Sequence, residues 1–443
     1  MGFDELRTAV LDTRLCTSCG VCELACPKEV IAFDGLEPVL TAAAGLGDEA
    51  CGDCHDCLDA CPGLDPRTPD AELRLFGRVR EADERWIGVY REVVGARARD
   101  GRLFEASASG GSITGLLQAS IDRLGVDTVL TMGRAAGTAW RAAPSLSESA
   151  AELVETTQST YQLAPYLGAL RTVMRQRPES RVAMSGIACH VQGVRKLQTL
   201  DTEAGRWARE HVVFVVELAC SSGTTPRGTE AMIEDLGGVA PDSVTRLRYR
   251  EGEYPGNIRI WTDDGTRRDV QFWKAVRHFA GNKTHRCLSC GDWMSGLADV
   301  SVSDGDPNIF AASVTGTASV DGVAGKHGRV FVRTERGAEV LRHAVGSGVL
   351  ETWPIDLVGM NLGLERKRNR RATYERSGQL IPAGPIPGFV EELEARPDEE
   401  FIAAPVPTLA AGASGRNGDG TNGDVGNSDR RNGNGRAGNG AAR

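Results

Sequence analysis

The stretch CTSCGVCELACP, residues 16–27, places four cysteines at the spacing C-x2-C-x2-C-x3-C and follows the last one with proline. The stretch CGDCHDCLDACP, residues 51–62, repeats that spacing and the closing Cys-Pro. The two stretches hold eight of the twelve cysteines in a chain of 443 residues. A tight loop with three thiolates at this spacing can wrap one face of an iron–sulfur cube, so the doubled motif predicts two such cubes.

This spacing is the bacterial ferredoxin pattern, in which the fourth cysteine of each run binds the other cluster. Zinc and disulfides are the alternatives, but zinc is typically bound by two separated pairs of ligands rather than by one four-cysteine run. We therefore predict a bacterial-type ferredoxin domain over residues 1–70 that carries one electron per 4Fe–4S cluster. One cluster is assigned to Cys16, Cys19, Cys22 and Cys61, and the other to Cys51, Cys54, Cys57 and Cys26.

Four cysteines remain outside this segment: Cys189, Cys220, Cys287 and Cys290. The C-x-x-C pair at 287–290 is either a redox disulfide or half of a four-ligand site. The two single cysteines close the apolar runs RVAMSGIAC and HVVFVVELAC, which predict strands, and carboxyl ends of strands gather along one rim of an α/β sheet. A third 4Fe–4S cluster is one interpretation of these four cysteines. The other is that single cysteines at strand ends are buried as hydrophobic residues.

From residue 71 to about residue 400 the sequence alternates between helix and strand patterns. GGSITGLLQASIDRLG (residues 110–125) predicts a helix that opens on glycines, and VDTVLTM predicts the strand that follows. NIRIWT, ADVSVSD and GRVFVRT are further predicted strands, with helices at TPRGTEAMIEDLGG and RGAEVLRHAV. This alternation predicts an α/β (α+β) domain with a mixed sheet over residues 71–400.

The final segment, residues 401–443, is rich in Gly, Asn and Arg and contains almost nothing apolar from residue 411 on, which predicts a disordered tail. The formal net charge of −9 argues against a nucleic-acid partner. No apolar run is long enough for a membrane span, and the first residues lack the apolar core of a signal peptide. We therefore expect a cytoplasmic protein.

Six motifs stand in order along the second domain: SASGGSITGLL, TQSTYQL, SGIACHVQGVRKL, VVELACSS, CLSCGDWMSGLADVSVSDGD and RVFVRTERG. Between about residues 85 and 350 they closely resemble the family formed by the beta subunits of coenzyme F420 hydrogenases and dehydrogenases. A two-cluster ferredoxin domain precedes the family's domain in some members. The resemblance implies a flavoprotein that holds FAD beside a 4Fe–4S cluster. The ligands of that cluster map here onto Cys189, Cys220, Cys287 and Cys290.

The resemblance also implies where the flavin is bound. SASGGSIT (residues 107–114) opens a helix, and a helix N-terminus presents free N–H groups to phosphate, although a Ser-Gly-Gly turn alone is more often a simple cap. Tyr161 either stacks on the flavin ring or packs in the core, and Asp304 either contacts the flavin or builds an Asx turn. The expected flavin-binding residues are Ser109, Gly110, Gly111, Thr114, Ser159, Tyr161 and Asp304.

Three residues are candidates for catalysis. Lys196, beside Arg195, could stabilise an anionic reduced flavin or the acidic deazaflavin coenzyme, or could lie on a solvated helix face. His190 is either a proton donor near the flavin or a satisfied core residue. Lys326, in the segment Gly-Lys-His, stands where the family often carries Trp-Ser, close to the expected flavin or substrate. Ala188 also replaces the family's usual proline.

These parts predict an oxidoreductase that exchanges hydride with coenzyme F420 at FAD and single electrons with a redox partner protein or an electron-acceptor complex through the clusters. One alternative is a ferredoxin-fed reductase of a small organic substrate at the flavin. Another is a non-catalytic electron-carrier subunit. No G-x-G-x-x-G fingerprint follows any predicted strand, which counts against a nicotinamide coenzyme.

Overall fold

The computed structural model describes residues 2–41, 51–81, 84, 87–253, 256–284, 286–287, 290–305 and 326–355. The predicted disordered tail, residues 401–443, and the end of the predicted α/β domain lie outside the described residues.

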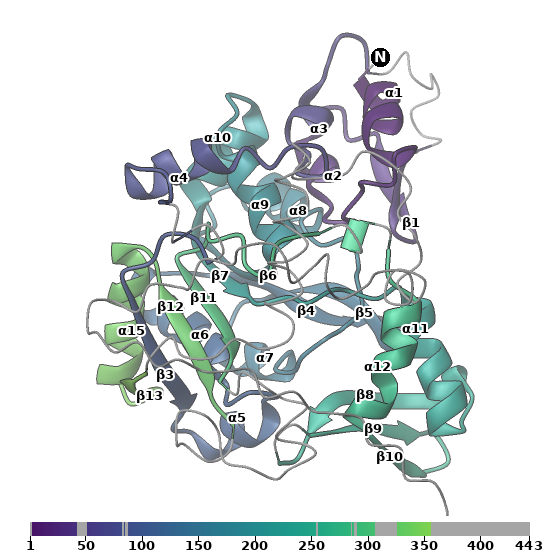
Figure 1. The fold of residues 1–443 in the computed structure, drawn as a ribbon. Helices are drawn as coiled ribbons and strands as arrows, with labels where there is room; N and C mark the ends of the chain where they lie inside the picture. The colour runs from purple at the N-terminus through teal and green to yellow at the C-terminus, as the bar shows by residue number, and fades with distance from the viewer. Residues whose placement is uncertain are drawn as a thin grey trace, which may run out of the picture. The chain divides into compact units, whose positions relative to one another are not determined.

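The cysteine-rich segment forms short elements joined by loops (Figure 1). Each run passes through a short helix, which holds Cys22 in the first run and Cys57 in the second. A two-stranded antiparallel hairpin follows the first run. The elements are α1 (Gly2–Leu6), the π-helix η1 (Arg7–Leu11), α2 (Val21–Ala25), β1 (Ile31–Asp34), β2 (Glu37–Leu40), α3 (Asp56–Asp59) and α4 (Thr68–Phe76).

An eight-stranded mixed sheet forms the centre of the rest of the chain, with the strand order β13-β3-β12-β11-β7-β6-β4-β5. The four neighbours β11, β7, β6 and β4 run parallel, and the strands on either side pair antiparallel. The mixed sheet that the sequence predicts is confirmed. The strands are β3 (Glu92–Ala98), β4 (Thr128–Ala135), β5 (Thr138–Ser147), β6 (Val182–Ile187), β7 (Val212–Leu218), β11 (Val300–Asp304), β12 (Gly328–Val332) and β13 (Leu350–Pro354).

Helices cover both faces of this sheet. Along β6, Val182 and Met184 enter one hydrophobic cluster and Ala183 enters another, because successive side chains of a strand point to opposite faces. Besides α2 and α4, the first cluster includes residues of α8 (Ala169–Gln176), α9 (Ala188–Leu197) and α10 (Glu203–His211). The second includes residues of α5 (Gly101–Ala106), α6 (Ser112–Leu124), α7 (Ala150–Glu155) and α15 (Glu335–Gly346).

A three-stranded antiparallel sheet, in the order β10-β9-β8, has a core of its own. That core combines aliphatic residues with aromatic ones, including Tyr249 and Phe279, which are both buried. The elements are α11 (Pro226–Met232), the π-helix η4 (Ile233–Gly237), the 3-10 turn η5 (Pro241–Ser243), β8 (Val244–Glu251), β9 (Asn257–Thr262), β10 (Arg267–Gln271) and α12 (Phe272–Gly281). Figure 1 shows α11 and α12 beside this small sheet.

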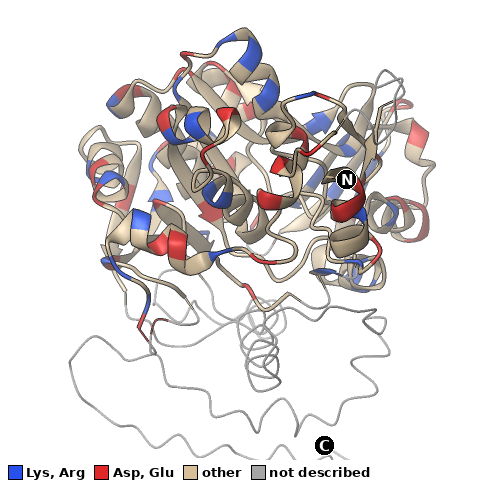
Figure 2. Cartoon of the chain, turned by 90° about the horizontal axis from the view of Figure 1, so that it is seen from above, with Lys and Arg blue, Asp and Glu red and all other residues tan. Residues whose placement is uncertain are grey.

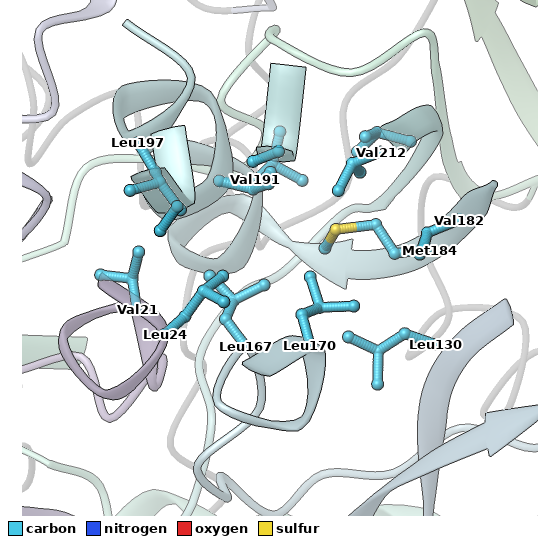
Figure 3. Packing of buried hydrophobic residues seen from close by; sticks show 14 of the residues in the cluster. Val21, Leu24, Leu130, Leu167, Leu170, Val182, Met184, Val191, Leu197 and Val212 are labelled. Atoms are coloured by element: carbon cyan, nitrogen blue, oxygen red, sulfur yellow. The ribbon is translucent and has the colours of Figure 1, made fainter. Parts of the chain in front are cut away.

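The cysteine-rich segment shares a hydrophobic core with the main sheet. Val21 and Leu24 of α2 belong to the same cluster as Leu167, Leu170 and Val191 (Figure 3). The carbonyl of Cys19 also accepts hydrogen bonds from the backbone N–H groups of Leu167 and Tyr166, at 2.8 and 3.3 Å. Each valine or leucine buried in this way stabilises the packing by about 1.5–3 kcal/mol, so the segment is held firmly against α9.

Arg195 of α9 and Asp299, the residue before β11, form a buried ion pair. Arg195 donates to Asp299 over 3.0 Å, and Asp299 also accepts from the backbone N–H of Val215 and the hydroxyl of Thr334. Both charged side chains are buried, so the alternative that Arg195 lies on a solvated helix face is wrong. The carboxylate of Asp299 can be buried because these donors replace the hydrogen bonds that water would supply.

We expect Asp299→Ala to lower the free energy of unfolding by about 3–5 kcal/mol, because it leaves Arg195 buried without its counterion. Denaturant unfolding of the full chain measures this loss. Asp122→Ala, at an exposed position of α6, is the control and should change stability by less than about 0.5 kcal/mol. Equal effects of the two substitutions would show that the ion pair does not stabilise the sheet.

Charged residues of both signs are interspersed over the face drawn in Figure 2. Within the described part of the chain, no helix has the length and apolar character needed to cross a membrane.

Candidate functional site

The first three cysteines of the first run and the last cysteine of the second form a single group of thiols. Burial and, to a smaller extent, the neighbouring thiolates of Cys61 and Cys19 raise the pKa of Cys16 to about 12. Burial also raises the pKa of Cys19 to about 11, again with Cys61 as a neighbour. Cys22 lies among the same thiols, and its pKa is raised well above the ordinary value. These four are the residues that the ferredoxin motif assigns to one cluster.

The remaining thiols of the ferredoxin segment form a second group. Burial raises the pKa of Cys57 to about 12, and the thiolates of Cys26, Cys51 and Cys54 act in the same direction. Burial and nearby Asp56, Cys26 and Cys51 likewise raise the pKa of Cys54. The structure therefore places the fourth cysteine of each run with the first three of the other run.

The four other cysteines also come together. The pKa of Cys189 is raised well above its ordinary value by burial and by the thiolates of Cys19, Cys220, Cys287 and Cys290. Cys189 does not end a strand as the sequence predicts, because β6 ends at Ile187 and Cys189 lies in the first turn of α9. Cys220 follows the end of the neighbouring strand β7 by two residues. The carboxyl ends of two adjacent parallel strands thus bring the single cysteines to one edge of the sheet.

The donor set suits iron–sulfur cubes. All twelve cysteines are free thiols, and backbone N–H groups lie 3.4 Å from the sulfur of Cys16, Cys61 and Cys290. Such N–H donors stabilise thiolates and are typical of cluster sites. Among the described residues, no three Cys, His, Asp or Glu side chains are grouped to bind a single metal ion. Four thiols with backbone N–H donors beside them are the ligands that a four-iron cube requires.

The Ser-Gly-Gly loop lies at the start of α6. Gly110 and Gly111 both have positive φ, 81° and 82°, and Gly111 is the N-cap of the helix. A Cβ on Gly110 would lie 2.9 Å from the carbonyl oxygen of Lys326 and 2.9 Å from the Cα of His327. The fold itself therefore requires these glycines, and the part of the loop that suits a phosphate is the N-terminus of α6.

Cationic side chains lie around this loop. The ammonium group of Lys326 donates to the carbonyls of Ser107 and Glu105 over 2.9 and 3.1 Å, and its pKa is lowered, first by burial and then by the charge of Arg250. Arg250 donates to both carboxylate oxygens of Asp304, at 3.0 and 3.1 Å. The hydroxyl of Ser109 hydrogen-bonds to the same carboxylate. Ser109, Asp304 and Arg250 thus connect the loop to β11 and β8.

The other predicted flavin contacts are divided between this loop and the protein core. The ring of Tyr161 stacks on Phe279, with centroids 5.5 Å apart, so it packs in the core of the small sheet. The hydroxyl of Tyr161 hydrogen-bonds to Arg250 and Ser159, on the side of the Ser-Gly-Gly loop. Thr114 does not face the loop surface. Its hydroxyl is buried and lies 3.1 Å from the hydroxyl of Thr157.

The predicted catalytic residues do not form one group. Lys196 donates to the carbonyl oxygens of Cys61 and Asp65, at 2.6 and 2.7 Å, so its ammonium group faces the ferredoxin segment. His190 is only 4% exposed and stacks on Tyr166 at 4.4 Å. Neither of its ring nitrogens has a hydrogen-bond partner among the described residues, and burial lowers its pKa to about 3. His190 is therefore neutral, and it is not the satisfied core histidine that the sequence offers as an alternative.

Sequence reasoning misses Arg250, and it places Gln158 in the predicted flavin segment without singling it out as a site residue. The side-chain carbonyl of Gln158 accepts from the backbone N–H of Arg250 over 3.0 Å, and its amide donates to the carbonyl of Ala106 over 3.0 Å. The signal for Gln158 was present in the motif TQSTYQL. Arg250 lies on β8, a strand of the small sheet that the hydrophobic pattern does not predict.

Comparisons with known proteins identify the same regions. Residues 93–171 match the N-terminal part of the coenzyme F420 hydrogenase/dehydrogenase beta subunit, and residues 179–357 match its C-terminal part. Residues 12–65 match a 4Fe–4S dicluster domain. The two family matches together span more than half of the chain.

Relatives and a solved structure agree with these matches. The coenzyme F420 hydrogenase subunit beta of Methanosarcina barkeri is 25% identical over 66% of this chain and 94% of its own length. A component of the F420H2 dehydrogenase of Methanosarcina mazei is 23% identical over 81% of this chain and 92% of its own length. A chain of the F420-reducing NiFe hydrogenase complex from Methanosarcina barkeri has the same fold, with a TM-score of 0.52 and 22% identity over 68% of this chain and 97% of that chain. The chain belongs to the family of coenzyme F420 hydrogenase/dehydrogenase beta subunits, which are oxidoreductases, and carries a 4Fe–4S dicluster domain before the family's own domain.

Proposed function

We propose that the chain transfers electrons between coenzyme F420 and one-electron carriers through FAD and three 4Fe–4S clusters. The observation that carries this proposal is the position of Cys189, whose thiol lies near those of Cys220, Cys287 and Cys290 and also near that of Cys19. The proposed third cluster therefore adjoins the ferredoxin cluster that contains Cys19. Neighbouring clusters are what a chain of single-electron steps requires.

Three features of the loop at the start of α6 support a flavin site there. The N-terminus of α6 offers backbone N–H groups, and Lys326 and Arg250 supply positive charge beside it. Ser109 is fixed by Asp304, and Asp304 by Arg250, so the loop is held in one conformation. Bound FAD would exchange hydride with a deazaflavin and single electrons with iron–sulfur clusters.

The cluster with Cys26, Cys51, Cys54 and Cys57 is the proposed exit to a redox partner protein or an electron-acceptor complex. Cys54 is partly exposed, whereas the other three thiols of this group are buried. A thiol that reaches the surface is where a partner's cofactor can come within electron-transfer distance. The solved relative is itself part of a hydrogenase complex, which supports a protein partner.

A second function, a ferredoxin-fed reductase of a small organic substrate, rests on one departure from the family pattern. Lys326 and His327 stand where the family often has Trp-Ser, and their backbone lies directly against Gly110 at the proposed flavin site. In this case electrons would enter through the ferredoxin clusters and leave at the flavin.

Anaerobic mixing with reduced coenzyme F420 distinguishes these functions. We expect rapid bleaching of flavin and cluster absorbance by reduced coenzyme F420 and none by NADPH, the control hydride donor. If the protein resists reduced coenzyme F420 but is bleached by a reduced ferredoxin, the ferredoxin-fed direction is correct. Bleaching by NADPH alone would exclude coenzyme F420 as the hydride carrier.

A further inference from the structure

A buried lysine of the α/β domain reaches into the ferredoxin segment. Lys196 lies on α9, is only 6% exposed, and donates to the carbonyl oxygens of Cys61 and Asp65 at 2.6 and 2.7 Å. No carboxylate of the described residues forms a salt bridge with it. An ammonium group that is bonded only to neutral carbonyls keeps its positive charge available to act on its surroundings.

A second buried cation acts on the same cysteine. The charges of Lys196 and Arg286 both act on the thiol of Cys61, whose sulfur also accepts from the backbone N–H of Gly63 at 3.4 Å. Arg286 is only 4% exposed and immediately precedes Cys287. Two cations of the α/β domain therefore lie near Cys61. Because both are buried, water screens their charges little.

The other ferredoxin thiols have a different environment. The charges that act most on Cys57 are those of the thiolates of Cys26, Cys51 and Cys54. Asp56 lies beside Cys54, and Asp59 lies beside Asp56. The two groups of thiols therefore have different charged neighbours: two buried cations act on Cys61 and the carboxylate of Glu37 acts on Cys16, whereas the carboxylate of Asp56 acts on Cys54.

The charge on a cluster depends on its redox state. Reduction adds one electron to a 4Fe–4S cube and forms or breaks no bond, so the reduced cube is more negative by one charge. A nearby cation stabilises the reduced form and raises the reduction potential, whereas burial away from water acts in the opposite direction. At low dielectric a buried cation has the stronger effect, because few water molecules screen it.

We propose that Lys196, assisted by Arg286, raises the reduction potential of the inner cluster. The inner cluster is the one assigned to Cys16, Cys19, Cys22 and Cys61. In this role Lys196 tunes the reduction potential of the inner cluster. The higher potential makes electron transfer from the third cluster to the inner cluster more favourable. The inference rests on the ligand grouping proposed above, but it does not depend on the flavin or on coenzyme F420.

The test is a mediator-assisted redox titration of the full chain, followed by electron paramagnetic resonance. We expect Lys196→Met to move the potential of one cluster to a more negative value and to leave the other clusters and the iron content unchanged. Lys196→Arg keeps the charge and should remain close to the wild-type potential. Lys274→Met removes an exposed lysine of α12 and should change no potential.

The sign of the shift separates tuning from a merely structural role. If Lys196 only clamps α9 to the ferredoxin segment, its loss lets water reach the inner cluster, and the potential rises or stays the same. Either result overturns the proposal. Should Lys196→Met fail to retain iron, Arg286→Met gives the decision, and an unchanged potential in that variant overturns the proposal as well. Because mediators and dithionite replace the natural donor, failure of the flavin proposal would leave these potentials measurable.

Discussion

Replacing Cys287 with alanine should remove about four of about twelve iron atoms per chain and disconnect the flavin from the ferredoxin clusters. The reason is the grouping around Cys189, to which Cys287 contributes one of four thiols. Reduced coenzyme F420 should still bleach the flavin in this variant. The ferredoxin clusters should then stay oxidised, because the route through the third cluster is missing. Iron analysis and stopped-flow absorbance measure the two effects.

Cys54→Ala is the matched control, because it removes a thiol from the exposed end of the same proposed route. It should also cost about four iron atoms, or leave a three-iron cluster. The third and inner clusters should still be reduced by coenzyme F420 in this variant, and only transfer to an external acceptor should fail. If Cys287→Ala instead keeps its full iron content, Cys287 and Cys290 are a redox-active pair or buried thiols, and the third cluster does not exist.

The ferredoxin segment shows how far spacing alone predicts structure. Eight cysteines in two identical runs match the bacterial ferredoxin pattern, in which the last cysteine of each run binds the cluster of the other run. The pattern therefore predicts that Cys61 joins the first run and Cys26 the second, and the thiols lie in these groups. The four other cysteines are far apart in sequence. Spacing leaves the redox pair and the cluster as alternatives, and only the adjacency of β6 and β7 in the sheet brings Cys189 and Cys220 to one edge.

The strands that sequence predicts well are those with continuous apolar runs. The buried strand β7, VVFVVEL, is one, because its residues pack on both faces of the sheet. β8, VTRLRYRE, is rich in arginine and shows no such run, so the hydrophobic pattern misses it and the site residue Arg250 with it. Its arginines range from the exposed Arg246 to the buried Arg250, so no apolar run marks the strand.

The position of the Lys196 side chain depends on tertiary contacts, which no local sequence pattern contains. Its position after Cys189 suggested the flavin or a solvated helix face, yet its ammonium group meets the carbonyls of Cys61 and Asp65, more than 130 residues earlier in the chain. A lysine of α9 could be placed there only once the docking of α2 on α9 was known. His190 shows the same limit, because its lack of hydrogen-bond partners is a property of the packed core.

The glycines of the flavin loop are a poor place to test flavin binding. A valine at Gly111 would force a side chain into the left-handed region, at φ 82°, and its Cβ would lie 3.1 Å from the Cγ of Leu103, closer than an ordinary van der Waals contact. A valine at Gly110 would meet the backbone of Lys326 and His327. Loss of flavin in either variant would therefore follow from local misfolding as readily as from a lost phosphate contact.

Lys326→Met is the sharper test. We expect it to weaken FAD binding by about 10- to 100-fold, because one charge-assisted hydrogen bond to a phosphate contributes about 1.5–3 kcal/mol. Methionine is close to lysine in length and fills a similar volume, but it also loses the hydrogen bonds to the carbonyls of Ser107 and Glu105, so thermal unfolding of the variant is measured beside the titration. Titration of the deflavinated protein with FAD, followed by flavin fluorescence, measures the change in affinity.

Thr114→Val is the control for this experiment, because the hydroxyl of Thr114 is buried against Thr157 and does not face the loop surface. It should cost about 1 kcal/mol of stability through the lost hydrogen bond and leave FAD affinity unchanged. Equal losses of flavin in the two variants would mean that general loosening of α6 explains both. Full FAD affinity in Lys326→Met would place the phosphate elsewhere, with Arg250 as the next residue to replace. A selective loss in Lys326→Met would instead identify the ammonium group beside the N-terminus of α6 as a flavin ligand, in the segment where this chain departs from its family.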